Sequence, residues 1–214
     1  MSNPAPSLSI QDLVARQFGP QAKAYVGSTV HAQGADLDAL GRRLALERPA
    51  RLLDLGCGGG HVSFTAAPHA EAVVAYDLSA EMLGAVAAEA ARRGLANIST
   101  RQGTAERLPF EAVGFDAVVS RYSAHHWSSL AAGLAEARRV LKAGGRAIFM
   151  DVVAPEDALL DTFLQAVEML RDPSHVRDYA PRQWRALAQA AGFEVEEETP
   201  RRLRLECSSW LARI

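Results

Sequence analysis

Short apolar runs alternate with longer amphipathic stretches along most of this chain. Each run is bounded by polar or glycine-rich residues, which is typical of strands that are buried on both faces of a parallel sheet. The predicted strands are Arg51–Asp54, Ala72–Tyr76, Ile98–Arg101, Phe115–Ser120 and Arg146–Met150. Helical patterns separate them, so the pattern predicts an α/β fold with a doubly wound, mostly parallel sheet and helices on both faces.

Capping residues and helix breakers delimit the predicted helices. After the first strand, these are His61–Ala67, one capped by Ser79 that runs to Arg93, one capped by Ser128 or Ser129 that runs through Leu141, Asp157–Leu170, and one from Pro181 that Gly192 ends. Before the first strand they are Ile10–Phe18, Ala22–Val30 and Asp36–Leu46. We therefore expect residues 1–47 to form an N-terminal helical lid and residues 48–214 to form the main domain, together making one globular unit.

A glycine-rich turn follows the first predicted strand. Asp54 closes that strand, and glycine then occupies four of the next six positions, at Gly56, Gly58, Gly59 and Gly60. Glycine permits positive φ and lets a ligand approach the backbone, and the following helix directs free N–H groups at the same place. The turn therefore predicts a site for a nucleotide-like ligand. A dinucleotide fingerprint would need glycine at the sixth position from Gly56, where the chain has His61.

The pattern that does fit is Asp54-x-Gly56-x-Gly58-x-Gly60, and it resembles the first motif of class I S-adenosylmethionine (SAM) dependent methyltransferases. With the segments that follow, the resemblance spans Arg51 to Val153 and looks most like the branch of ubiquinone/menaquinone-biosynthesis C-methyltransferases. It implies a Rossmann-like fold, SAM as cofactor and S-adenosylhomocysteine as product. It also implies that Asp54 supports the methionine part of SAM while the glycines make room for it.

Asp77 follows the second predicted strand, roughly 20 residues beyond the glycine turn, where nucleotide-binding α/β units place an acid on the ribose hydroxyls. A carboxylate can accept from both hydroxyls at once. Leu78 and Met82 flank this acid, and either can pack on the adenine. Met82 fits a place in the core equally well.

The turn after the third predicted strand resembles the adenine-contacting turn of the family. The family often has aspartate where this chain has Thr104. The hydroxyl of Thr104 or the carboxylate of Glu106 then takes the bond from the adenine amino group, and Ala105 offers its backbone N–H. A plain polar loop is the alternative interpretation.

Polar and aromatic residues crowd the end of the fourth predicted strand, where open α/β sheets bind ligands. Arg121 is assigned to the cofactor side of the site. Tyr25 of the lid is also assigned there, and the alternative is that Tyr25 only packs the lid helices onto the domain. His125 and His126 are the candidate catalytic residues on the acceptor side. A base is needed only if the acceptor loses a proton, and a histidine with a purely structural role is the alternative for each.

Composition narrows the partners. The chain has 214 residues and a formal net charge of −2, so it has no bulk attraction for nucleic acid. It shows no signal peptide and no apolar run long enough to span a membrane. Cys57 and Cys207 form no C-x-x-C pair, which argues for a reducing cytoplasm and against a metal site. The expected partner is a small-molecule methyl acceptor, and a homodimer is compatible with the sequence.

Two further strand candidates, Phe193–Glu198 and Arg202–Glu206, follow the last predicted helix. The family's sheet has seven strands, and a helix capped by Ser208 or Ser209 would have barely one turn before the chain stops. We therefore expect a truncated chain or one without its closing strand, with a sheet edge that another segment or a second copy covers.

The function that these observations favour is methyl transfer from SAM to a small molecule. One alternative is a SAM-binding protein without transferase activity, such as a sensor or partner subunit. A second is an NAD(P)-dependent oxidoreductase, which Asp54 and His61 disfavour.

Overall fold

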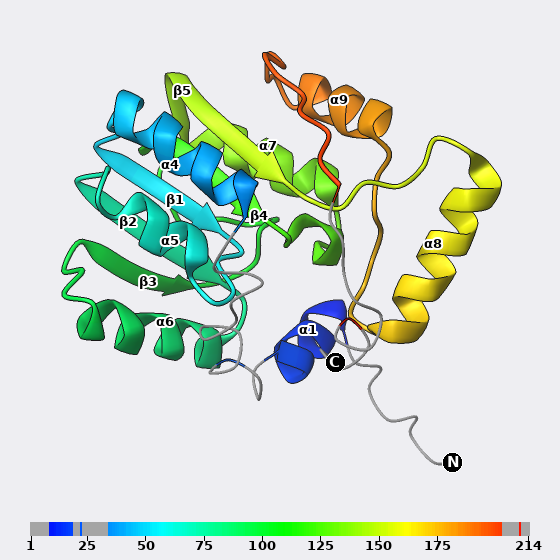
Figure 1. Cartoon of the computed structure of the whole chain (residues 1–214), viewed down its shortest axis with the longest axis horizontal. Helices are drawn as coiled ribbons and strands as arrows, with labels where there is room; N and C mark the ends of the chain where they lie inside the picture. Colours follow the sequence, from blue (N-terminus) through cyan, green and yellow to red (C-terminus); the bar gives the residue numbers. More distant parts are fainter. Residues whose placement is uncertain (1–8, 19–21, 23–33, 203–209, 211–214) are drawn as a thin grey trace.

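A five-stranded parallel sheet forms the centre of the molecule (Figure 1). The computed structural model describes residues 9–18, 22, 34–202 and 210. The strands are β1 (Arg51–Leu55), β2 (Ala72–Asp77), β3 (Ile98–Gln102), β4 (Phe115–Arg121) and β5 (Leu141–Met150), in the order β3-β2-β1-β4-β5. All four strand pairings are parallel. The predicted α/β fold is confirmed, and all five predicted strands are present.

Helices cover both faces of this sheet. Those in the described part of the chain are α1 (Ile10–Phe18), α4 (Ala35–Glu47), α5 (His61–Ala66), α6 (Ala80–Arg92), the 3₁₀ turn η2 (Ala124–His126), α7 (Leu130–Val140), α8 (Ala158–Arg171) and α9 (Pro181–Ala190). The helices α6 and α7 begin where capping residues predict, because Ser79 Oγ accepts from Met82 N and Ser129 Oγ accepts from Ala132 N. The sequence allowed either Ser128 or Ser129 as the cap of α7, and the structure shows Ser129.

The first strand shows why its sequence is apolar on both sides. Leu52 packs toward α4 and α5, in a core that includes Leu44. Leu53 and Leu55 point the other way, toward α7, in a core that includes Leu134. All five leucines are fully buried. A strand covered on both faces cannot alternate apolar with polar residues, so it reads as a continuous apolar run.

The helix α4 packs on the sheet, since Leu37, Leu40 and Leu44 share a core with residues of β1 and β4. We expect Leu44→Ala to lower the free energy of unfolding by about 2–5 kcal/mol, because a fully buried leucine leaves a cavity. Leu46→Ala is the matched control. Leu46 lies on the same helix at 87% exposure, and its replacement should change stability by less than about 0.5 kcal/mol. Urea denaturation of both variants measures the difference, and equal losses would contradict this packing.

The order of the strands fixes where a ligand can bind. From β1 the chain steps outward to β2 and β3, then returns to pair β4 with the other side of β1. The loops after β1 and β4 therefore leave the sheet on opposite faces and open a crevice at their carboxyl ends. The glycine turn after β1 lies at this point.

The predicted strand Phe193–Glu198 is wrong. These residues have no regular secondary structure and join no strand of the sheet. Figure 1 shows the segment running along β5 after α9. Its acids instead reach arginines, as Glu196 pairs with Arg146 and Glu198 pairs with Arg185 at 2.7 Å. Most of the second candidate, Arg202–Glu206, lies outside the described residues, as do Ser208 and Ser209. The expectation of a missing closing strand therefore stays a prediction.

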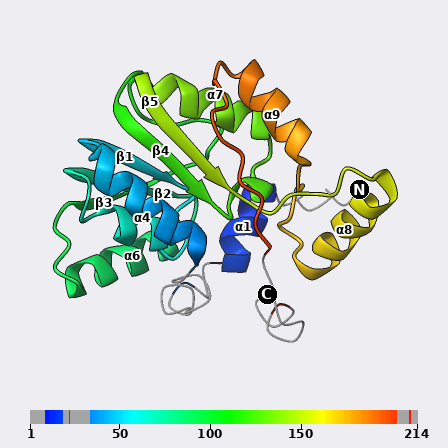
Figure 2. The ribbon, with the colours of Figure 1, turned by 45° about the horizontal axis from the view of Figure 1, so that its top comes forward.

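The helix α8 stands away from the sheet in both views of the ribbon (Figure 2). Glu168 is its buried residue. Large apolar side chains on it are exposed: Leu159, Leu160, Phe163, Met169 and Leu170. The sequence predicted an amphipathic helix, and the structure turns its polar side toward the rest of the chain. No helix among the described residues is both long and apolar enough to cross a membrane.

Candidate active site

A cleft runs along the carboxyl ends of the strands and continues along the outer edge of β5, where residues 192–202 also line it. Its volume is about 1760 Å³, above the roughly 300–1,000 Å³ of a usual small-ligand site, so it has room for more than one small molecule. The loops after β1 and β4 meet here, because a Cβ on Gly56 would overlap Ser123 Oγ. Gly56 also has φ 74°, so both its conformation and its surroundings require glycine.

Asp54 holds the start of α5 against the end of β1. Its Oδ2 accepts from Ser63 N at 2.9 Å and from Ser63 Oγ at 2.6 Å. Its Oδ1 is buried and has no hydrogen-bond partner among the described residues. Burial is the largest influence on this carboxyl and raises its pKa to about 7, despite the bonds from Ser63. Asp54 does not line the cleft itself.

The other glycines of the turn divide between packing and access. A Cβ on Gly60 would press on Val86 and Phe64, so Gly60 serves close packing of α5. A Cβ on Gly58 would meet no protein atom within 4 Å, and Gly58 lines the cleft. Gly58 also has φ 47°. The backbone at Gly58 is therefore the part of the turn that a ligand can approach.

Asp77 ends β2 and faces the cleft beside Gly58. Its Oδ2 accepts from Gly58 N at 2.8 Å and its Oδ1 from Ser79 N at 2.9 Å. Burial raises the pKa of this carboxyl. Each oxygen keeps a second lone pair, so the carboxylate can hold the glycine turn and still accept from a ligand.

The residues predicted to surround an adenine line the same part of the cleft: Leu78, Met82, Thr104, Ala105 and Glu106. Met82 is 2% exposed and also belongs to the buried core. The Thr104 carbonyl accepts from Tyr76 Oη at 3.0 Å, and Glu106 Oε1 accepts from Ser129 N at 3.3 Å. Glu106 therefore ties this turn to the start of α7.

Arg121, at the end of β4, lines the cleft but is engaged by another residue. Its Nε lies 2.5 Å from Asp36 Oδ2, and both side chains are largely buried. This ion pair joins the start of α4 to the sheet, so part of the guanidinium's role is to hold the N-terminal region in place. Tyr25, also predicted on the cofactor side, lies outside the described residues.

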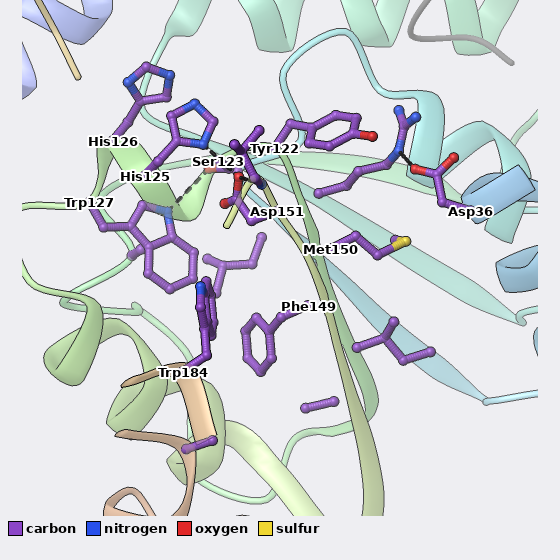
Figure 3. A pocket seen from close by; sticks show the side chains of 18 of the residues that line it. Asp36, Tyr122, Ser123, His125, His126, Trp127, Phe149, Met150, Asp151 and Trp184 are labelled. Atoms are coloured by element: carbon purple, nitrogen blue, oxygen red, sulfur yellow. Dashed lines mark hydrogen bonds and ion pairs between the residues drawn. The ribbon is translucent and has the colours of Figure 1, made fainter. Parts of the chain in front are cut away.

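His125 and Asp151 form a buried pair on the other side of the cleft (Figure 3). His125 Nδ1 lies 2.6 Å from Asp151 Oδ1. Asp151 also accepts from Ala124 N and Val152 N, each at 2.8 Å. Burial lowers the pKa of His125, but the Asp151 carboxylate more than offsets this and raises it to about 9. His125 is therefore protonated at neutral pH.

His126 turns to different partners. Its Nδ1 faces the carbonyl of Ser174 at 3.1 Å, and its ring meets Phe18 of α1 edge-on at 5.1 Å. Burial and the neighbouring charge of His125 lower the pKa of His126, so the ring is neutral at pH 7. The two histidine rings lie 4.2 Å apart and both line the cleft, but they differ in charge.

Sequence reasoning missed several residues of the site. Asp151 directly follows β5, and Asp54 and Asp77 lie at the ends of β1 and β2. An acid at the carboxyl end of a strand was therefore the signal that could have identified Asp151. Asp178 lines the cleft but follows no strand. Phe149 and Trp184 form an aromatic wall with ring centroids 5.8 Å apart (Figure 3), and α9 shows no sign of this in its sequence.

Comparisons with known proteins identify the family. Residues 53–149 match the family described as a methyltransferase domain. The chain is 52% identical to the uncharacterized protein YafE of Escherichia coli over 159 residues, covering 74% of this chain and 77% of YafE. It is 35% identical to the uncharacterized methyltransferase YcgJ of Bacillus subtilis over 196 residues, 92% of this chain and 78% of YcgJ. The crystal structure of YcgJ superposes with a TM-score of 0.78 over 82% of this chain and 76% of that one.

The chain belongs to the class I SAM-dependent methyltransferases. A demethylmenaquinone methyltransferase of Chlorobaculum tepidum is also similar, at 30% identity over 71% of this chain and 65% of that protein. The resemblance drawn from the glycine turn is confirmed, and SAM is the cofactor. The oxidoreductase alternative does not apply.

The residues of this methyltransferase fit its cofactor. The open space over Gly58 and the carboxylate of Asp77 lie side by side at the switch point of the sheet. The unpartnered Oδ1 of Asp54 is a buried polar atom behind the same turn. In the described part of the chain, no group of three or more His, Cys, Asp or Glu side chains is arranged to hold a metal ion.

Two alanine substitutions in the glycine turn of the methyltransferase should separate stability from binding. Gly58→Ala should weaken SAM binding at least tenfold, because its methyl group enters the space that a ligand needs, with a loss of stability limited to about 1 kcal/mol from the positive φ. Gly56→Ala should mainly destabilise the fold, because its methyl group meets Ser123. Thermal unfolding and calorimetric titration with SAM distinguish the two, and an unchanged SAM affinity in folded Gly58→Ala would contradict this assignment.

Proposed function

We propose that this methyltransferase acts on a small-molecule acceptor, which binds between the His125 side of the cleft and the aromatic wall of β5 and α9. The observation that carries the proposal is that two different groups of residues line one cleft. One group is the glycine turn with Asp77. The other is the buried His125–Asp151 pair with Phe149 and Trp184 (Figure 3).

On the cofactor side, we propose that Asp77 accepts from the two ribose hydroxyls and that the backbone at Gly58 lies against the methionine part. Leu78, Met82 and Ala105 would enclose the adenine, with Thr104 or Glu106 accepting from its amino group. The support is that all five line the cleft and that the turn of Thr104 contacts the end of β2 through Tyr76. Asp54 and Gly60 would act indirectly by holding the turn and α5 in shape.

SAM supplies an activated methyl group, so the protein's task is to align the acceptor and exclude water. The arrangement around His125 suits that task. The Asp151 carboxylate fixes the imidazolium by a short bond, and α1 covers the neighbouring His126 through Phe18. We propose that residues 1–47 act as a lid, in which α1 and Tyr25 help to cover the cleft. The name of the Chlorobaculum relative supports a small-molecule acceptor.

The test is formation of S-adenosylhomocysteine from SAM with a panel of quinols, phenols and amines. We expect turnover with at least one class, and binding of SAM or S-adenosylhomocysteine but not NADH in calorimetric titrations. Cofactor binding without turnover on any member would favour a protein that binds SAM for another purpose. Tight NADH binding without a response to SAM would contradict the whole proposal.

The proposal also places the protein in the cytoplasm, which is supported by the two cysteines without a C-x-x-C spacing. Nucleic acid is not the proposed acceptor, since the net charge of −2 gives no general attraction for phosphates. Light scattering tests whether a second copy is a partner.

A further inference from the structure

A second acidic residue lies in the acceptor side of the cleft. Asp178 is 2% exposed and lines the cleft together with His125 and Asp151. Its Oδ2 is buried and has no hydrogen-bond partner in the described part of the chain. A buried polar atom without a partner costs free energy. The position therefore calls for an explanation that the packing does not give.

The backbone of Asp178 is held at its N–H and its C=O, whereas Oδ2 of its side chain has no partner among the described residues. Gln165 of α8 donates from Nε2 to the Asp178 carbonyl at 2.9 Å, and Gln165 Oε1 accepts from Asp178 N at 3.1 Å. The next residue, Tyr179, forms a β-bridge with Val153 just after β5. Two elements thus fix where Asp178 sits, while Oδ2 of its carboxyl group stays unpartnered among the described residues.

The other acids of this region already have partners. Asp151 pairs with His125, and Glu168 pairs with Arg171 at 2.7 Å. Asp161 pairs with Arg177, and Asp172 accepts from the hydroxyl of Ser174, at 2.6 Å in each case. Of the carboxylates described around the two histidines, Asp178 is the one with a free buried oxygen.

The two histidines are poor candidates for a base. His125 already carries its proton at neutral pH, held by Asp151. Burial and the charge of His125 lower the pKa of His126, which makes it a weaker base than a free imidazole. Burial raises the pKa of Asp178 to about 7, and Asp151 and Glu168 act in the same direction while His125 and Arg171 oppose them. A group that titrates near the working pH is suited to general base catalysis.

We propose that Asp178 accepts the hydrogen bond of the acceptor's O–H or N–H group and takes its proton as the methyl group is transferred. The inference rests on the proposed function. The new bond joins the methyl carbon to the acceptor, and the carbon–sulfur bond of the cofactor breaks with its electron pair going to sulfur. The sulfonium thereby loses its positive charge, and the proton that leaves the acceptor neutralises the carboxylate of Asp178.

A binding experiment tests this without turnover. The protein saturated with S-adenosylhomocysteine is titrated with phenol and anisole, and with aniline and N,N-dimethylaniline. The second member of each pair lacks the proton. At pH 8 we expect the wild type to prefer phenol over anisole, or aniline over dimethylaniline, by about tenfold, and the pair that shows the preference distinguishes a hydroxyl from an amine acceptor.

The variants make the assignment specific. Asp178→Leu keeps a side chain of similar shape and should lose the preference. Asp116→Asn should keep it, because Asp116 does not line the cleft and pairs with Lys142 at the other end of the sheet. In the wild type the preference should fall as the pH is lowered from 8 to 6, because Asp178 becomes protonated. Should Asp178→Leu prove unstable, Asp178→Asn is used instead. Its preference for the ligand with the proton should then be the same at pH 8 and pH 6.

No preference in the wild type at pH 8, or the same pH-dependent preference in the Asp178 variants, would overturn the proposal. Failure of the proposed function looks different, since it appears as an absence of S-adenosylhomocysteine formation with every acceptor. With an acceptor that does turn over, Asp178→Asn should lower kcat by about 10²-fold or more and remove the acidic limb of the pH profile near 7, while SAM affinity stays within twofold.

Discussion

Replacing Asp77 by alanine should weaken SAM binding by about one to two powers of ten. The carboxylate lies in the cleft at the end of β2, and hydrogen bonds to a charged group contribute about 1.5–3 kcal/mol. Alanine would leave the ribose hydroxyls without this acceptor. Calorimetric titration with SAM, and separately with S-adenosylhomocysteine, measures the loss.

A second variant separates direct binding from support of the glycine turn. Asp77→Asn retains the shape and can still accept from Gly58 N or Ser79 N, but it lacks the charge that strengthens bonds to two hydroxyls. It should therefore show an intermediate affinity. Glu71 is exposed and directly precedes β2, at the end opposite Asp77, so Glu71→Ala should leave affinity unchanged. A folded Asp77→Ala variant with wild-type affinity would refute the ribose assignment.

Replacing Asp151 by asparagine should lower the free energy of unfolding by about 3 kcal/mol near neutral pH. The folded protein holds His125 with a pKa of about 9, against 6.5 ordinarily, and one pKa unit corresponds to about 1.4 kcal/mol. Asparagine removes the charge that sustains this shift. It also turns an amide NH₂ group toward Ala124 N or Val152 N, both of which donate to the carboxylate in the wild type. Urea denaturation at pH 7 measures the loss.

The pH dependence gives this prediction a direction. Because the folded pKa of His125 is raised, its contribution to stability is complete below about pH 6.5 and is lost as the pH rises through 9. The raised carboxyl pKa values of Asp54 and Asp178, both about 7, act mainly below this window. The wild type should therefore lose stability between about pH 7.5 and 9, and Asp151→Asn should lose much less.

Asp116→Asn is the matched control for that experiment. Asp116 pairs with Lys142 at 2.7 Å at the other end of the sheet, where both side chains are partly exposed. Such a surface pair contributes about 0–1 kcal/mol. A similar loss of stability in both variants, or a wild-type stability that is flat from pH 7 to 9, would contradict the assignment of a buried charged pair at His125.

The sheet and its ligand edge could be predicted because their signals are local. A strand covered on both faces needs apolar residues such as Leu52 and Leu53 in succession. The turn after it needs a positive φ at Gly56, which residues with a side chain rarely adopt. The caps at Ser79 and Ser129 depend on residues three positions away. Where the local signal was only alternation, as at Phe193–Glu198, it predicted a strand that is absent. The glutamates there meet arginines instead of completing a ladder.

The sequence by itself determined the parallel sheet, the glycine turn and the acid at Asp77, because each depends on backbone geometry within a few residues. Only the tertiary structure decided which polar groups meet. His125 and Asp151 are 26 residues apart, and Asp36 and Arg121 are 85 apart, so no spacing predicts either pair. The same holds for α8, whose amphipathic pattern is clear but whose polar side faces inward, toward the segment that carries Asp178. In α8 the inward side is the one on which Asp161 bonds with Arg177 and Gln165 bonds with Asp178, partners that the sequence pattern does not reveal.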